Sequence, residues 1–297
     1  MTKYFPSVFL FQLLFFAAWL TGFGQAGKVT VPGELYFNHL ARENGLPSDV
    51  VFCAIQDFRG YIWIGTSNGL VRFDGHDMKV FRSIPGDGTS LVDNSIYTLL
   101  QTSDSILWIG TGNGLSLYKP HDGTLRNFPF DGTRQGKFPV GRINSFFEEA
   151  NGHVWIATAN GLIRATRNGS SFDHFKLRLN CGAQKQEDDL NIITCIAQDP
   201  RKPGALLLGT MCGLVRFDIL KKAIDRVYKG PHPDYNMIRS MLPDSRHQIW
   251  VCGWGFGLCS FDLSTETWKV YNPGLSKISI LTMIHKKYSP LFSIAND

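Results

Sequence analysis

Long hydrophobic runs are missing from nearly all of this 297-residue chain. After residue 20, no segment reaches the roughly 20 apolar residues that a membrane-spanning helix needs. The excess of positive charge is also small, because 30 Lys and Arg against 25 Asp and Glu leave a net charge of only +5. The basic residues form no stripe along the sequence. These absences argue against a membrane span beyond the N-terminus and against nucleic-acid binding.

Paired metal ligands are missing as well. The eight His residues are dispersed, and none stands at ligand spacing from a Cys or from another His, so we expect no metal site and no cofactor. The six cysteines form no C-x-x-C pair, and Cys53 and Cys195 occupy the same register of two repeats, whereas Cys181 falls in a long loop and Cys212 in a turn. We expect buried or loop thiols rather than a disulfide framework.

One apolar run stands at the start of the chain. Lys3 precedes the apolar residues 8–20, and small residues follow at 22–27. This order is typical of a signal peptide, with cleavage near Gly24 or Ala26. An uncleaved anchor is the alternative, although the run is short for one. The sequence predicts a signal peptide at residues 1–26 and a periplasmic mature protein.

A repeated unit dominates the rest of the sequence. It reads Trp-Ile-Gly-Thr followed by Asn-Gly-Leu, and its copies begin at Trp63, Trp108, Trp155, Leu207 and Trp250. The copies begin 45, 47, 52 and 43 residues apart, the length of one four-stranded propeller blade. We expect the aromatic residue to pack one blade onto the next, a contact that Leu207 preserves in the fourth copy.

Each copy divides into four short strands. In the first copy, strands are expected at 50–55, 61–66, 70–73 and around 79–82, and the same order recurs from Ile96, Ile143, Ile192 and Ile238. Asn and Gly tolerate the positive φ that tight hairpins require. The hairpin glycines are Gly69, Gly114, Gly161, Gly213 and Gly257. The predicted fold is therefore an all-β propeller of four-stranded antiparallel blades.

The repeats do not complete a ring. Blades are expected to start near residues 46, 92, 140, 190 and 236, with a truncated one near 275 whose second strand degenerates at 291–297. Residues 35–40 resemble an outermost strand given to the last blade. We therefore expect residues 27–297 to form an incomplete propeller of about five and a half blades, a fragment or truncated product that is poorly soluble or oligomeric alone because its edges are exposed.

The first copy carries a family resemblance. The residues Gly45-Leu46-Pro47-Ser48, Gln56-Asp57, Gly60 to Leu70 and Phe73-Asp74-Gly75 resemble the two-component regulator propeller repeat. The resemblance implies the periplasmic sensor region of a hybrid histidine kinase that regulates polysaccharide utilisation. Kinase activity in such proteins would belong to sequence absent here, so no enzyme activity is expected of this chain. The implied partners are the missing blades and kinase module of a parent protein, or a homodimer partner.

An oligosaccharide is the expected ligand, bound where the hairpins and blade connections meet on one face. The insertions there are 84–93, 129–141 and 176–189, and loops on a rigid scaffold commonly carry binding residues. Candidate ligand-binding residues are Trp254, Phe256, Arg142, Arg239, Asp188 and Asp189. The alternatives are an exported scaffold for protein interaction and a propeller enzyme such as a lyase, which the apolar strand starts disfavour.

Overall fold

The computed structural model describes residues 40–130, 138, 141–177, 179, 191–231, 237–244, 247–254 and 256–271. Its contacts separate residues 1–39 from the unit Leu40–Asp297, and only the second unit is considered below. The predicted signal peptide, nearly all of the predicted strand at 35–40 and the sixth repeat at 274–297 lie outside the described residues. No helix in the described part of the chain has the length and apolar character needed to cross a membrane.

In the described residues, twenty strands follow one short 3-10 helix at Arg42–Asn44. The first and second sheets contain β1 (Val51–Gln56), β2 (Ile62–Thr66), β3 (Gly69–Phe73), β4 (Met78–Phe81), β5 (Ile96–Gln101), β6 (Leu107–Thr111), β7 (Gly114–Lys119) and β8 (Thr124–Pro129). The third and fourth contain β9 (Ile143–Glu148), β10 (Val154–Thr158), β11 (Gly161–Ala165), β12 (Phe172–Phe175), β13 (Ile193–Gln198), β14 (Ala205–Thr210), β15 (Gly213–Asp218) and β16 (Ala223–Tyr228). The fifth contains β17 (Ile238–Pro243), β18 (Gln248–Gly253), β19 (Gly257–Asp262) and β20 (Thr267–Val270).

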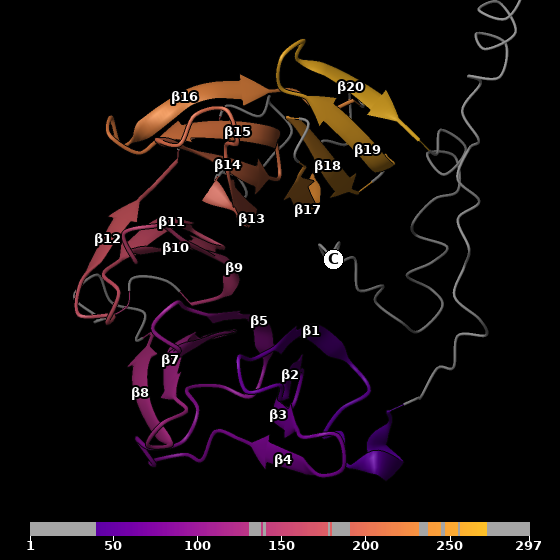
Figure 1. Ribbon diagram of the computed structural model, residues 1–297. Coiled ribbons are helices and arrows are strands. Elements are labelled where there is room, and N and C mark those ends of the chain that lie inside the picture. Colours follow the sequence, from indigo (N-terminus) through magenta and orange to yellow (C-terminus); the bar gives the residue numbers. More distant parts are fainter. Residues whose placement is uncertain are drawn as a thin grey trace, which may run out of the picture. The chain divides into compact units, whose positions relative to one another are not determined.

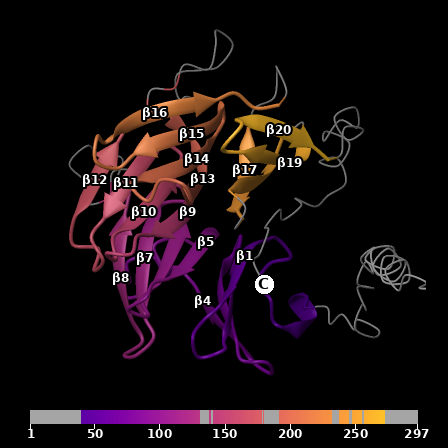
Figure 2. The same cartoon turned by 45° about the horizontal axis from the view of Figure 1, so that its top comes forward.

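Each sheet is a simple antiparallel meander in which four consecutive strands pair in chain order. The first strands of the sheets, β1, β5, β9, β13 and β17, pack against one another in sequence, and the fourth strands lie outermost (Figure 1). Figure 2 shows the same five sheets side by side from a second direction. The predicted fold, a propeller of four-stranded antiparallel blades, is confirmed.

The repeat tryptophans lie between consecutive blades. Trp63, Trp108 and Trp155 are fully buried. The ring of Trp63 lies 5.3 Å from that of Tyr118 in the second sheet, and the ring of Trp155 lies 5.7 Å from that of Phe217 in the fourth. Each tryptophan therefore seals its own blade against the following one. Leu207 is also fully buried and belongs to a core cluster made largely of fifth-sheet residues.

The indole N–H has a hydrogen-bond acceptor in two of these three tryptophans. Trp63 Nε1 donates to Asp57 Oδ2 at 2.8 Å, and Trp155 Nε1 donates to Glu149. In the second blade Thr102 occupies the corresponding position, and Trp108 Nε1 is buried without a partner in the described structure. Because an unpaired buried donor costs about 1–3 kcal/mol, the second blade lacks a stabilising bond that the first and third blades have.

Threonine and glycine close the hairpins together. Thr66 Oγ1 donates to Gly69 O at 2.8 Å and accepts from the Asn68 amide at 3.0 Å, and the same Thr-to-Gly bond recurs in the next three sheets. The glycine has a positive φ of 126°. The expectation that the Asn also takes a positive φ is wrong, because no hairpin Asn is among the described non-glycine residues with positive φ.

The fifth hairpin replaces this threonine with an aromatic ring. Gly253 pairs with Gly257 at the register of the Thr–Gly pair, and a Cβ on Gly253 would stand 1.8 Å from Phe256 Cζ. Phe256 is only 3% exposed and belongs to the core cluster of the fourth and fifth sheets. Its ring thus fills the space that the threonine side chain occupies elsewhere.

The cysteines differ from expectation at one position. Cys53, Cys195, Cys252 and Cys259 are free thiols, and burial raises the pKa of Cys53 and of Cys195 to about 12. Cys212, in the fourth hairpin, is disulfide-bonded, so its assignment as a thiol is wrong; its partner and Cys181 lie outside the described residues. The error arose because the pairing of cysteines cannot be deduced from one sequence without a spacing motif.

Candidate functional site

The hairpins of all five blades lie at the same end as the starts of the inner strands. The backbone amides of Ser67, Gly112, Ala159 and Trp254 donate to the carbonyls of Val50, Ser95, Arg142 and Met237, each just before or at the start of an inner strand. We call this end the hairpin face. The expectation that hairpins and blade connections share one face therefore holds for these four blades.

A β-bulge recurs at the start of every inner strand. The pairing register shifts at the second residue of β1, β5, β9, β13 and β17. The bulged residues are Phe52, Tyr97, Asn144, Thr194 and Arg239. Bulges re-aim side chains and are frequent next to functional sites. Because the inner strands pack against one another, these residues gather with Arg142 into one group, called here the axial cluster.

Aromatic stacking orders one side of the axial cluster. The rings of Phe52 and Tyr97 stack with centroids 4.7 Å apart. The guanidinium carbon of Arg142 lies 4.7 Å from the centroid of Tyr97, within the range of a cation–π contact. Residues from the first three blades therefore form one stack.

Hydrogen bonds continue this order toward the fifth blade. Arg142 Nε donates to Asn144 Oδ1 at 2.8 Å, and Asn144 Nδ2 donates to Ile193 O at 2.7 Å. Thr194 Oγ1 then donates to Ile238 O at 2.5 Å, and Ile238 immediately precedes Arg239. A chain of three side-chain bonds thus links Arg142 to the backbone beside Arg239 and holds three blades in register.

The axial cluster is positively charged. Desolvation by the surrounding walls, and then the positive charge of Arg142, lower the pKa of the Arg239 guanidinium, although both arginine side chains remain exposed. In the described part of the chain, neither arginine forms an ion pair with a carboxylate. The site therefore holds two mutually repelling cations that solvent can reach.

The ligand-binding candidates from the sequence differ in their position and exposure in the structure. The fold brings Arg142 and Arg239 within electrostatic reach of each other. It places Trp254, 39% exposed, at the start of β17, because the Trp254 amide donates to Met237 O at 2.8 Å. Phe256 is instead a core residue, so its expected contact with a ligand has no support in its burial. Asp188 and Asp189 lie outside the described residues, as does most of the insertions 129–141 and 176–189.

Sequence reasoning missed four members of the axial cluster, namely Phe52, Tyr97, Asn144 and Thr194. They fall inside segments that read as apolar first strands, where a bulge has no sequence signature of its own. The available signal was their variability: at this register the five copies carry Phe, Tyr, Asn, Thr and Arg, whereas the preceding position is always Val or Ile. A varied position beside a constant apolar one indicates a side chain that leaves the core.

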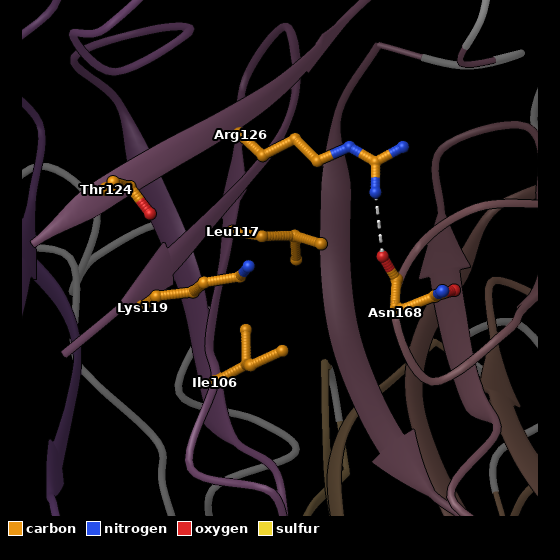
Figure 3. A pocket seen from close by; sticks show the side chains of 6 residues that line it. All are labelled: Ile106, Leu117, Lys119, Thr124, Arg126 and Asn168. Carbon is orange, nitrogen blue, oxygen red and sulfur yellow. Dashed lines mark hydrogen bonds between the residues drawn. The ribbon is translucent and has the colours of Figure 1, made fainter. Parts of the chain in front are cut away.

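A depression lies between strands β7 and β8 of the second blade and the turn between β11 and β12 of the third blade (Figure 3). It is lined by Ile106, Leu117, Lys119, Thr124, Arg126 and Asn168. Arg126 is already engaged, because its Nη1 donates to Asn168 O at 3.1 Å and its guanidinium carbon lies 4.9 Å from the centroid of the Phe128 ring. The depression borders the turn between β7 and β8, at the opposite end of β7 from the hairpin face. We interpret it as a packing seam.

A protein-family model matches two of the repeats. The family is described as the two component regulator propeller, and the matched residues are 45–68 and 90–113. Both segments end within a blade hairpin, so each matches the approach to an inner strand, that strand and the second strand of a blade. The two matches fall on the first two blades.

Similar proteins include a histidine kinase and an extracellular domain. Histidine kinase P4 of Formosa agariphila is 44% identical over 48 residues, which is 16% of this chain and 4% of that protein. The extracellular domain of the hybrid two-component system BT3049 from B. thetaiotaomicron is 20% identical with a TM-score of 0.65, over 78% of this chain and 31% of that one. An ancestral GH74 enzyme is 12% identical with a TM-score of 0.57, over 75% of this chain and 31% of that one.

The sequence and structural similarities support different conclusions. The two structural likenesses show the fold alone, and this chain spans about a third of the length of each. The repeat motif and the family match carry more, because both rest on the same residues of the first two blades. The chain is therefore a β-propeller whose first two blades match the two component regulator propeller family.

Proposed function

We propose that this chain is the ligand-sensing propeller region of a two-component regulator, exported to the periplasm, and that it binds an oligosaccharide at the hairpin face. The observation that carries the proposal is the axial cluster, in which five blades contribute one group of half-buried or exposed polar and aromatic side chains near the start of β17, where Trp254 is also bonded. The repeat tryptophans Trp63, Trp108 and Trp155 are buried and are unavailable to a ligand.

Three findings support the location. Cys212 is disulfide-bonded, and disulfides persist in oxidising compartments such as the periplasm. The BT3049 structure is an extracellular domain, and the apolar run at 8–20 has the order of a signal peptide.

The chemistry of the cluster suits a sugar. A pyranose ring presents an apolar face that stacks on an exposed indole, and hydroxyl groups that pair with amide and guanidinium groups. Trp254 supplies the indole, and Arg142 and Asn144 supply polar groups. A ligand that spans the axial cluster would contact several blades at once and bias their relative positions, which is the change that a sensor passes to its partner module.

Trp254→Ala tests the proposal. After a glycan-array screen of the full chain, calorimetry with the strongest oligosaccharide is expected to show at least about tenfold weaker binding by the variant, because it loses the stacking platform. Phe58→Ala is the matched control, since Phe58 is 61% exposed but lies in the turn at the opposite end of β1. Unchanged affinity in Trp254→Ala would contradict the proposed site. Binding of no oligosaccharide by the parent chain would contradict the proposed function.

A further inference from the structure

We propose that the saccharide bound at the axial cluster is acidic, and that Arg142 and Arg239 together hold its anionic group, either a uronic acid carboxylate or a sulfate ester. This inference rests on the proposed function and names the class of sugar. It concerns Arg142 and Arg239 alone and leaves the stacking role of Trp254 unchanged.

The geometry brings two arginines of different blades to one place. Arg142 precedes β9 and Arg239 is the bulged residue of β17, and the bonds Asn144–Ile193 and Thr194–Ile238 connect their backbones across the third, fourth and fifth blades. Both side chains are exposed on the hairpin face. A group placed between them would be reached by cations from two sides.

The charges at this place are uncompensated within the described residues. Other arginines do have carboxylate partners: Arg164 pairs with Glu149, Arg216 with Asp225 and Arg226 with Glu266. Neither Arg142 nor Arg239 has such a carboxylate. Desolvation, and then the repulsion from Arg142, lower the pKa of Arg239. An anionic ligand would relieve that repulsion, whereas a neutral one would leave it in place.

The side chain of Arg142 is also held in a fixed orientation by its contacts. Its Nε is used by Asn144 and its face rests on Tyr97, which in turn stacks on Phe52. Its two terminal amino groups form no hydrogen bond with the described residues, and a guanidinium bonds carboxylate or sulfate oxygens through paired N–H groups. Because stacking and the Nε bond already fix the side chain, little conformational entropy is lost when the anion binds.

The test is calorimetry on the full chain with three probes. An oligogalacturonide carries carboxylates, its methyl ester is the same chain without charge, and a κ-carrageenan tetrasaccharide carries sulfate without a uronic acid. Wild type is expected to bind at least one acidic probe more tightly than the neutral ester, and high salt should weaken that binding. The acidic probe that binds more tightly identifies the anionic group.

Three variants locate the effect. Arg142→Gln and Arg239→Gln are each expected to weaken binding of the acidic probe by about 10- to 100-fold, the worth of a charge-assisted pair. Binding of the ester should weaken much less, because Gln still offers a hydrogen bond to a hydroxyl group and no charge pair is lost. Arg126→Gln is the matched control, because Arg126 also has one hydrogen bond and one aromatic contact but lies outside the axial cluster. Arg142→Lys, which retains the charge without the fork, should give an intermediate affinity, and unchanged thermal melting confirms folding.

The outcomes separate the two proposals. If the ester bound as tightly as both acidic probes, with an affinity that Arg142→Gln and Arg239→Gln left unchanged, the proposal of an acidic ligand would be overturned. That result would leave the proposal of an oligosaccharide sensor in place. Equal losses in Arg126→Gln and Arg142→Gln would also overturn it, because the effect would then be one of general charge. Failure of the wild-type chain to bind any saccharide, charged or neutral, would overturn the proposed function itself.

Discussion

Gly110→Val is expected to lower the free energy of unfolding by more than about 4 kcal/mol, a loss comparable to the whole stability of many domains. A Cβ on Gly110 would stand 2.6 Å from Thr98 Cγ2 in its own sheet and 2.8 Å from Ile143 Cγ2 in the next. Thr and Ile are β-branched and stiff, and Ile143 is fully buried, so neither can move aside. Urea unfolding followed by tryptophan fluorescence measures the loss.

In other blades, a smaller residue on the inner strand faces a larger residue at the third position of the repeat. Where the third residue of the repeat is Gly, its partner on the inner strand is Cys or Thr, as in Gly65–Cys53 and Gly110–Thr98. In the third blade Ala157 stands opposite Ser145, and in the fifth Cys252 stands opposite Ser240. A larger residue on one strand therefore accompanies serine on the other.

The compensation can be transplanted into the second blade. Gly110→Ala is expected to cost about 1–3 kcal/mol by overpacking, and the double variant with Thr98→Ser should recover at least about 1 kcal/mol relative to the sum of the two single changes. Ala157→Gly serves as the control in the blade that already accommodates a Cβ, with a cost of about 1 kcal/mol. Strict additivity of the Thr98 and Gly110 changes would contradict this account of blade spacing.

Trp155→Ala is expected to cost about 3–5 kcal/mol, the usual loss for a large aromatic removed from a core. Trp155 is fully buried, its ring lies 5.8 Å from that of Phe175 and 5.7 Å from that of Phe217, and its indole N–H pairs with Glu149. Truncation would open a cavity between the third and fourth blades and remove a hydrogen bond. Urea unfolding is again the measurement.

Trp250→Ala is the matched comparison for Trp155→Ala. Trp250 occupies the same register but is only half-buried, and its ring packs on Tyr271 of the same blade at 5.0 Å. Its removal should cost about half as much or less, because buried area sets the loss. Equal costs for the two variants would show that Trp250 is covered as fully as Trp155, contrary to the difference in burial.

The fold could be predicted from the sequence because its determinants are local and repeated. The blade period, the hairpin glycines and the packing role of Trp63 all follow from spacing and residue type. The repeat motif shows that Gly110 is a glycine. It does not show why a glycine is required there, because a contact that excludes a Cβ is made with Ile143 of the next blade. The disulfide at Cys212 escaped prediction because no C-x-x-C pair or other disulfide motif includes this residue.

The candidate site was only partly predictable. Arg142 and Arg239 were found as charged residues near strand starts, yet their proximity is a product of the topology, which gathers the starts of distant strands. Phe256 was a candidate because an aromatic residue in a hairpin can face a ligand, whereas its side chain is 3% exposed and fills the space above Gly253. Tyr97 and Asn144 were missed because the bulges that re-aim them depend on pairing with the neighbouring strand.

Hydrogen exchange of the full chain, with and without a saturating oligogalacturonide, tests the central claim that recognition takes place at the hairpin face. The account predicts slower amide exchange at the starts of the inner strands, around Tyr97, Asn144 and Arg239, and in the hairpin at Trp254. The outer strands β4, β8 and β12 should be unaffected. Protection confined to those outer strands, or to the turn at Phe58, would contradict the claim.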